Sequence, residues 1–213
     1  MAQAVGSRVM RCYVGTRNNR RTELPLSVHI ENTVKVLRAV RTQALDAGVR
    51  IAVENHAGDM QAREVKALIE EAGKDFVGAC LDTGNAMSVA EDPLLTLETL
   101  VPYVATSHVR DRAVFEHPRG AAMQLEIITG RLPEIRAYLE PDYWKAFLQT
   151  PAWEFARFLA LAKGGRPFLG NMVIGQWFDN SPVLEAALKE QQRVDLERSL
   201  EYAKKKLGVD WRG

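Results

Sequence analysis

Short apolar runs alternate with longer amphipathic segments between about residues 9 and 109 of the chain. Four of these runs are rich in β-branched and small apolar residues, as strands buried on both faces are. They begin at Val9, Val49, Val77 and Val104 and have the sequences VMRCYV, VRIAVE, VGACLD and VATSHV. Because strands that alternate with helical segments are typical of βα units, the pattern predicts a parallel sheet.

The segments between the strands carry the signals of helix ends. Ile30, Val34 and Leu37 fall on one face of the first helix, and Gly48 follows that helix as a C-terminal glycine does. Asp59 precedes the second helical segment. Before the third, Asp92 is followed by a proline, the order typical of an N-cap and a first helical residue.

The βα rhythm breaks after His108. Residues 111–124 lack a helical apolar period and contain a proline and a glycine, so we expect an irregular link. A fifth strand, LEIIT, is expected from Leu125, and a final helix from about Val183 to Leu207. The expected organisation is one domain over residues 1–213, with barrel-like βα units over 8–130 and a helical C-terminal extension over 131–213.

Composition and charge narrow the classes of partner. The 213 residues have a formal net charge of +1, which lacks the basic excess of a nucleic-acid or anionic-membrane binder. The sequence has neither a secretory signal nor an apolar run of about 18 residues, so we expect a cytoplasmic protein without a membrane span. Cys12 and Cys80 lie within predicted strands and are expected to be free thiols.

Polar residues recur where the predicted strands end. Glu54, Asp82 and His108 each close a strand, and Glu126 lies within LEII. Intervals of 28 and 26 residues separate the first three, about one βα unit each, so their side chains should meet at the rim where parallel folds build their sites. Singly, each would be an ordinary solvated strand end. Together, three carboxylates and an imidazole suit Mn, Mg, Co or Zn.

Four motifs that contain these residues, ENH, LDTGN, SHVRD and LEI, resemble those of the xylose-isomerase-like TIM barrels, which include sugar and sugar-phosphate isomerases and epimerases. The resemblance implies that Glu54, Asp82, His108 and Glu126 bind one divalent metal on strands five to eight. It implies a metal-dependent isomerase or epimerase that abstracts a proton next to the carbonyl of a sugar or sugar derivative through a metal-bound enediolate. Glu54 and Glu126 would be the acid and base.

Three further residues are candidates for binding the sugar. His56 and Arg110 each lie two residues beyond a predicted metal ligand and could bind hydroxyls or a phosphate. Asn85 stands where epimerases of this group often carry a histidine, in the pattern Asp-x-x-His. An amide can bind a hydroxyl but does not titrate near neutrality, which argues against that particular epimerase reaction and leaves the predicted metal site intact.

The resemblance covers roughly residues 8–170, whereas a complete barrel of this kind has about 250 residues. Three βα units ahead of Val9 and the helix after His108 have no counterpart. The expected fold is therefore α/β: a partial (β/α) TIM-type barrel of parallel strands with outer helices and a helical C-terminal extension. It would be a fragment, a reduced barrel, or a barrel completed in a homo-oligomer.

Three other functions fit parts of the sequence. A non-catalytic or accessory metal-binding subunit is the main alternative, because missing strands would leave the rim open to water. An aspartic protease, suggested by Asp82-Thr83-Gly84, needs two such carboxylates on an all-β scaffold, which the βα alternation opposes. An endonuclease would need clustered basic residues that the neutral charge does not favour.

Overall fold

The computed structural model describes residues 2–110, 112–117, 121–126, 134–166, 182–206 and 208; in β5 to β7 it describes the backbone and the side chain of Val114. The strands are β1 Val9–Cys12, β2 Arg50–Glu54, β3 Val77–Asp82, β4 Val104–His108, β5 Arg112–His117, β6 Ala121–Glu126 and β7 Glu134–Arg136. The α-helices are α1 Leu26–Ala39, α2 Arg41–Asp46, α3 Ala62–Ala72, α4 Pro93–Leu100, α5 Pro141–Trp144, α6 Ala152–Gly164 and α7 Pro182–Lys206. Short 3₁₀ helices are η1 Gln3–Val5, η2 Arg17–Arg21, η3 Asn85–Val89 and η4 Val101–Tyr103.

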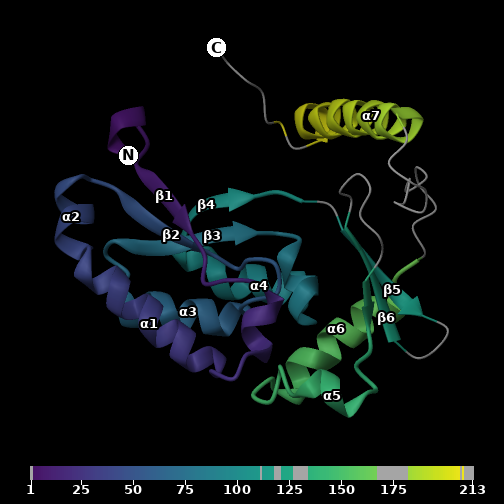
Figure 1. Cartoon of the computed structure of the whole chain (residues 1–213), viewed down its shortest axis with the longest axis horizontal. Helices are drawn as coiled ribbons and strands as arrows, with labels where there is room; N and C mark the ends of the chain where they lie inside the picture. The colour runs from purple at the N-terminus through teal and green to yellow at the C-terminus, as the bar shows by residue number, and fades with distance from the viewer. Residues whose placement is uncertain are drawn as a thin grey trace. The chain divides into compact units, whose positions relative to one another are not determined.

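The first four strands form one parallel sheet in the order β1-β2-β3-β4 (Figure 1). The four predicted strands are confirmed, each within two residues of its expected ends. All six residues of β3 are buried, as its apolar sequence requires of a central strand. With helices between successive strands, this sheet is half of a (β/α) barrel.

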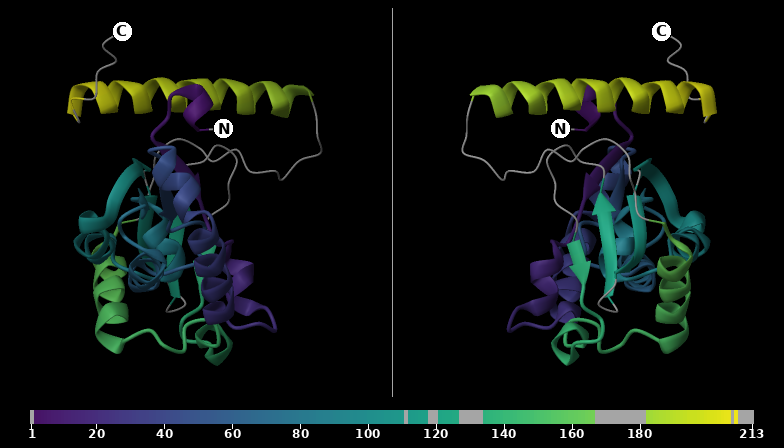
Figure 2. Two further views of the ribbon diagram at one scale, coloured as in Figure 1. Left: turned by 90° about the vertical axis from the view of Figure 1, so that its left-hand side faces the viewer. Right: turned by 90° about the vertical axis from the view of Figure 1, so that its right-hand side faces the viewer.

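Helices cover one face of this sheet, as Figure 1 and the two side views of Figure 2 show. Val53 and Leu81 from the strands pack against Val65, Leu68 and Ile69 of α3 in a single buried core. Each such side chain contributes about 1.5–3 kcal/mol on burial, so the amphipathic helices are held to the sheet mainly by their apolar faces. The polar side chains at the carboxyl ends of the strands lie on the opposite face.

The helix boundaries follow local capping chemistry. Asp92 caps α4, because its side chain accepts a hydrogen bond from the backbone of Leu94 at 3.0 Å, as predicted. Asp59 is not the N-cap of α3. That position belongs to Gln61, which forms a reciprocal capping box with Glu64, so the helix begins three residues after Asp59. Gly48 follows α2 with a φ of 61°, in the left-handed region.

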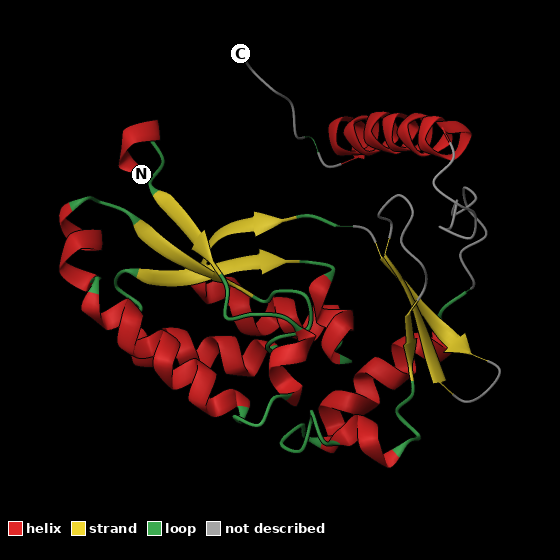
Figure 3. Cartoon of the chain, viewed as in Figure 1, coloured by secondary structure: helices red, strands yellow, loops and turns green. Residues whose placement is uncertain are grey.

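The segment after β4 forms a second sheet, in the order β5-β6-β7, which Figure 3 separates from the first. β6 pairs antiparallel with β7. Two predictions were therefore wrong: the link over residues 111–124 contains strands, and the strand at Leu125 is the end of β6 rather than a fifth parallel strand. Because β6 pairs within the second sheet and not beside β4, no crossover helix is needed between β4 and β6. The proline and glycine fall between β5 and β6 rather than marking the whole link as loop.

The chain is divided into two compact units. The larger unit is Met1–Gln124 with Glu134–Pro167, and the smaller is Leu125–Pro133 with Phe168–Gly213. In the larger unit, Val114 of β5 and Phe158 of α6 join a second buried cluster with Phe147, next to α5. In the smaller, α7 confirms the predicted final helix. Within the described ranges, no helix has the length and apolar character needed to cross a membrane. The single-domain organisation stays a prediction.

Candidate metal centre

Three predicted metal ligands lie at the carboxyl ends of neighbouring strands. In the parallel pairing, Glu54 of β2 is opposite Cys80 of β3, and Asp82 of β3 is opposite His108 of β4. Because side chains alternate along a strand, these four residues share the face of the sheet that the helices do not cover. The structure thus brings Glu54, Asp82 and His108 together.

The imidazole of His108 lies between the two carboxylates. Its Nδ1 is 3.3 Å from Oε1 of Glu54 and 3.9 Å from Oδ2 of Asp82. The side chains of both acids are fully buried, whereas that of His108 is 38% exposed. Because an ionised carboxylate only accepts hydrogen bonds, Nδ1 of His108 is the donor to Glu54 in this arrangement.

The ends of β2 and β3 are locked together by Asn55. Its side-chain amide donates to the carbonyl of Asp82 at 3.0 Å and accepts from the backbone N–H of Asp82 at 2.8 Å. In turn, Oδ1 of Asp82 accepts hydrogen bonds from the backbone of Gly84 and Asn85, at 2.9 and 3.0 Å. The LDTGN motif therefore fixes the orientation of the Asp82 carboxylate and commits one of its oxygens to the turn.

The other oxygen of Asp82 is directed toward the site. Oδ2 is buried and accepts no hydrogen bond within the described part of the chain, although Nε of Arg110 lies 2.8 Å from it as an ion pair. Burial raises the pKa of Asp82, and the nearby Arg110 partly offsets this effect. This oxygen could bind a cation only if Arg110 moved away from it, because Nε of Arg110 occupies that position.

An arginine accompanies each of the two acids. Arg110 pairs with Asp82, and Arg11 of β1 pairs with Oε2 of Glu54. Sequence reasoning included Arg110 as a substrate-binding residue but missed Arg11. The signal for Arg11 was present, since it is the one charged residue in the apolar run VMRCYV. These guanidinium groups place a positive charge next to each buried carboxylate.

Of the other predicted substrate-binding residues, Asn85 contacts this cluster directly, whereas His56 is linked to it through Tyr13 and Arg11. The amide of Asn85 is buried and donates to Oε1 of Glu54 at 3.5 Å. His56 stacks on the ring of Tyr13 with centroids 4.0 Å apart, and Arg11 lies over the same tyrosine ring. Nδ1 of His56 is 2.7 Å from the carbonyl of Gly15, so Nδ1 carries the proton and Nε2 is the acceptor of the neutral ring.

A tight turn after β2 positions His56. Ala57 and Gly58 have φ values of 35° and 87°, and Asp59 closes the turn by accepting a hydrogen bond from the backbone of His56 at 3.0 Å. Asp59 also accepts from the backbone of Gly15 at 3.0 Å, which ties the segment after β1 to this turn. Burial raises the pKa of Asp59 to about 6, against the lowering effect of these N–H groups.

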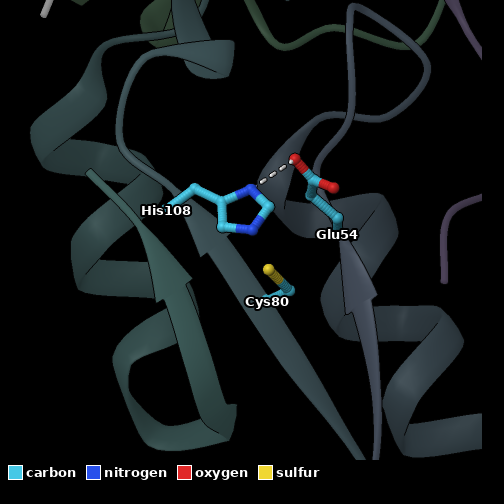
Figure 4. A group of neighbouring side chains, drawn as sticks. All are labelled: Glu54, Cys80 and His108. Carbon is cyan, nitrogen blue, oxygen red and sulfur yellow. Dashed lines mark hydrogen bonds and ion pairs between the residues drawn. The ribbon is translucent and has the colours of Figure 1, made fainter. Parts of the chain in front are cut away.

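A residue that sequence reasoning left outside the site is Cys80. One ligand atom each from Glu54, Cys80 and His108 lies within 4.8 Å of the other two, and Figure 4 shows the three side chains directed toward one another. Burial, with the nearby charge of Glu54, raises the pKa of the Cys80 thiol to about 11. Both cysteines are free, as expected.

The fourth predicted ligand stays a prediction. Glu126 ends β6, and its side chain lies outside the described residues. The donors that are described, two carboxylates and an imidazole next to a thiol, match the oxygen, nitrogen and sulfur ligands that divalent transition metals take in proteins. By the chemistry and the closeness of its donors, this set fits a divalent cation.

A parallel half-barrel with polar side chains gathered at the carboxyl ends of its strands is the architecture of a (β/α)-barrel protein. The family described as xylose isomerase-like TIM barrel matches residues 1–133, and the chain belongs to this family. The resemblance inferred from the motifs is therefore confirmed at the level of the family.

Individual relatives are distant and longer than this chain. An uncharacterized protein of Escherichia coli, YihM, is 26% identical over 81 residues, which are 38% of this chain and 24% of that protein. A xylose isomerase-like TIM barrel protein from Mycobacterium smegmatis, solved in complex with magnesium, is 16% identical with a TM-score of 0.45 over 59% of this chain and 47% of its own. A xylose isomerase domain protein from Planctomyces limnophilus is 18% identical, with a TM-score of 0.40 over 55% of this chain and 40% of that protein. The chain spans less than half of each.

Proposed function

We propose that the larger unit binds a divalent cation through Glu54, Asp82 and His108, and that the protein is a metal-dependent isomerase or epimerase of a sugar or sugar derivative. The observation that carries the proposal is the convergence of the three side chains, in which Nδ1 of His108 lies 3.3 Å from Oε1 of the buried Glu54 and 3.9 Å from Oδ2 of the buried Asp82. Membership of the xylose isomerase-like family supports the reaction class.

In this proposal, each residue of the chain has a separate task. A bound cation would polarise a carbonyl and so make the adjacent C–H proton easier to remove. Glu54, whose carboxylate is held by Arg11 and Asn85, is proposed to move that proton, with Glu126 as its partner. Asn85, Arg110 and His56 would bind substrate hydroxyls or a phosphate through N–H donors and, for His56, the acceptor Nε2.

A non-catalytic metal-binding role is the second candidate, and a specific observation favours it. Arg11 and Arg110 pair with the same carboxylates that a cation would need. A metal stabilises a buried carboxylate less when that carboxylate already has a cationic partner. Proton transfer also requires that water be excluded from the reacting groups. A homo-oligomer that completes the barrel, the other partner expected from the sequence, also stays a proposal.

Proton exchange separates the two functions. The full chain, with manganese, is incubated with a panel of ketoses and aldoses in deuterated water, and deuterium incorporation next to the carbonyl is measured by NMR. An isomerase or epimerase incorporates deuterium into at least one sugar, and Asp82→Asn abolishes the incorporation. Asp75→Asn is the matched control, since Asp75 pairs with Arg41 at the surface. Metal binding without exchange into any sugar would favour the accessory role.

A further inference from the structure

The two cysteines of the chain face opposite sides of the sheet. Cys12 of β1 is opposite Val53 and packs against the apolar core beneath the helices. Cys80 is opposite Glu54, so its thiol lies on the polar face with the acids and the imidazole. Cys12 therefore has the packing role common for a buried thiol, whereas the neighbours of Cys80 are metal-binding groups.

The spacing of these groups suits a common ligand. In a tetrahedral zinc site, bonds of about 2.0 to 2.3 Å place the ligand atoms about 3.3 to 3.8 Å apart. The ligand atoms of Glu54, Cys80 and His108 all lie within 4.8 Å of one another (Figure 4). At the limit of 4.8 Å, the separation exceeds the tetrahedral spacing by about 1 Å, so the three side chains would close by up to that distance on a common cation.

The two acids next to Cys80 are oriented by hydrogen bonds and an ion pair. Glu54 is oriented by Arg11 and Asn85, and the adjacent Asp82 is fixed by the turn that follows β3. The acids on either side of the thiol are thus held in place before any ligand binds. A site whose ligands are held in advance requires less ordering on metal binding.

We infer that Cys80 is a ligand of the metal site, so that the site takes a thiophilic divalent cation, zinc or cobalt, in preference to magnesium. This inference rests on the proposed cation site. Thiolate is a soft ligand that favours zinc and cobalt, whereas magnesium takes oxygen ligands. On binding, the sulfur forms its bond to the cation and the thiol proton is released to solvent, with no change in oxidation state.

Cobalt substitution tests the inference by spectroscopy. The full chain, freed of metal with a chelator, is titrated with Co²⁺, and absorption is recorded in the visible and near ultraviolet. We expect a thiolate-to-cobalt charge-transfer band that saturates at one cobalt per chain. It should disappear in Cys80→Ser and Cys80→Ala and persist in Cys12→Ser, the matched control. Competition should show zinc affinity reduced roughly tenfold or more in Cys80→Ser, with magnesium affinity nearly unchanged.

The possible outcomes separate this inference from the proposed cation site. Cobalt that binds with visible bands but without the charge-transfer band shows that the sulfur is not a ligand, while the site of Glu54, Asp82 and His108 stands. A charge-transfer band that survives in Cys80→Ala but not in Cys12→Ser also overturns the inference. If the chain binds no cobalt, zinc or manganese, both proposals fail. Whether any thiolate binds cobalt is measured in the unmodified chain and needs no variant, and the persistence of the band in Cys12→Ser assigns it to Cys80.

Discussion

Nε of Arg110 lies 2.8 Å from Oδ2 of Asp82, the oxygen that the turn after β3 leaves without a hydrogen bond. A guanidinium in this position supplies the positive charge that a metal would otherwise supply. Arg110 follows β4 by two residues and is one-third exposed, so it can withdraw from the carboxylate without unfolding the sheet. A cation bound at Asp82, as proposed, would therefore compete with Arg110 for this oxygen.

Removal of the competing guanidinium should strengthen cation binding. We expect Arg110→Gln to raise manganese affinity several-fold, because it removes a positive charge next to the ligand oxygen. The same change should lower the free energy of unfolding of the metal-free protein by about 1–2 kcal/mol, since a buried carboxylate loses its partner. Calorimetric titration and urea unfolding measure the two effects.

The control for this variant is Arg41→Gln, which breaks a pair with Asp75 in which both side chains are about half exposed. Exposed pairs of this kind contribute roughly 0–1 kcal/mol, and this one is remote from the predicted ligands in sequence. Weaker manganese binding by Arg110→Gln than by the unmodified chain would show that Arg110 assists the cation rather than competes with it.

A side chain at Gly58 should destabilise the turn that positions His56. A Cβ at this position would lie 3.2 Å from Cβ of Arg17 and 3.4 Å from the carbonyl of Ser88, in addition to the strain of a φ of 87°. Gly48 has a φ of 61°, and a Cβ there would meet no atom within 4 Å, so Gly48→Ala measures the backbone strain alone. We expect Gly48→Ala to cost about 1 kcal/mol and Gly58→Ala about 1 kcal/mol more. Equal losses in urea unfolding would contradict the close packing around Gly58.

Glu91 should make the stability of the larger unit depend on pH. Burial raises its pKa to about 7 from 4.5, although it accepts hydrogen bonds from the backbone of Ala62 and the hydroxyl of Thr96. Because the folded state holds the proton that the unfolded state releases, the contribution of Glu91 is fully present below pH 4.5. It decreases as the pH rises to about 7. We expect a loss of about 2–3 kcal/mol across this window.

A glutamine at position 91 should remove this dependence. The free energy of unfolding of Glu91→Gln, relative to the unmodified chain, should rise between pH 5 and 7.5, as urea unfolding at several pH values would measure. Glu31→Gln, at an exposed position of α1, is the control. If the profiles of the unmodified chain and of Glu91→Gln run parallel, the carboxylate does not titrate in this range.

Local sequence specifies the first sheet well and the second poorly. The run VGACLD is apolar at every position but the last, and it becomes β3 with the expected ends because only a strand buried on both faces suits such a run. By contrast, the sequences RAVFEH and AAMQLE do not indicate which strand each would pair with, or whether the pairing would be parallel or antiparallel. The proline and glycine between them favour an irregular link. Their pairing depends on which segment they meet in the fold, which local sequence does not encode.

Those residues of the candidate site that lie at the end of a predicted strand could be predicted from the sequence. Glu54, Asp82 and His108 follow apolar runs directly, so their positions could be inferred one by one. Cys80 and Arg11 lie inside such runs, and their membership of the site depends on which face of the sheet they point to. The alternation of side chains places Cys80 on the same face as Asp82, two residues later, and that relationship was available in the sequence.

The measurement that tests the proposed metal site most directly is a calorimetric titration of the metal-free full chain with manganese. We predict one site per chain, with binding reduced at least about a hundredfold in Asp82→Asn and in His108→Ala and retained in Asp75→Asn. Thermal unfolding at a manganese concentration a hundred times the dissociation constant should show a stabilisation of about 2.7 kcal/mol. Two results would contradict the assignment of a metal site at the ends of β2, β3 and β4. One is the absence of binding to the unmodified chain, and the other is binding by Asp82→Asn and His108→Ala as tight as that of the unmodified chain.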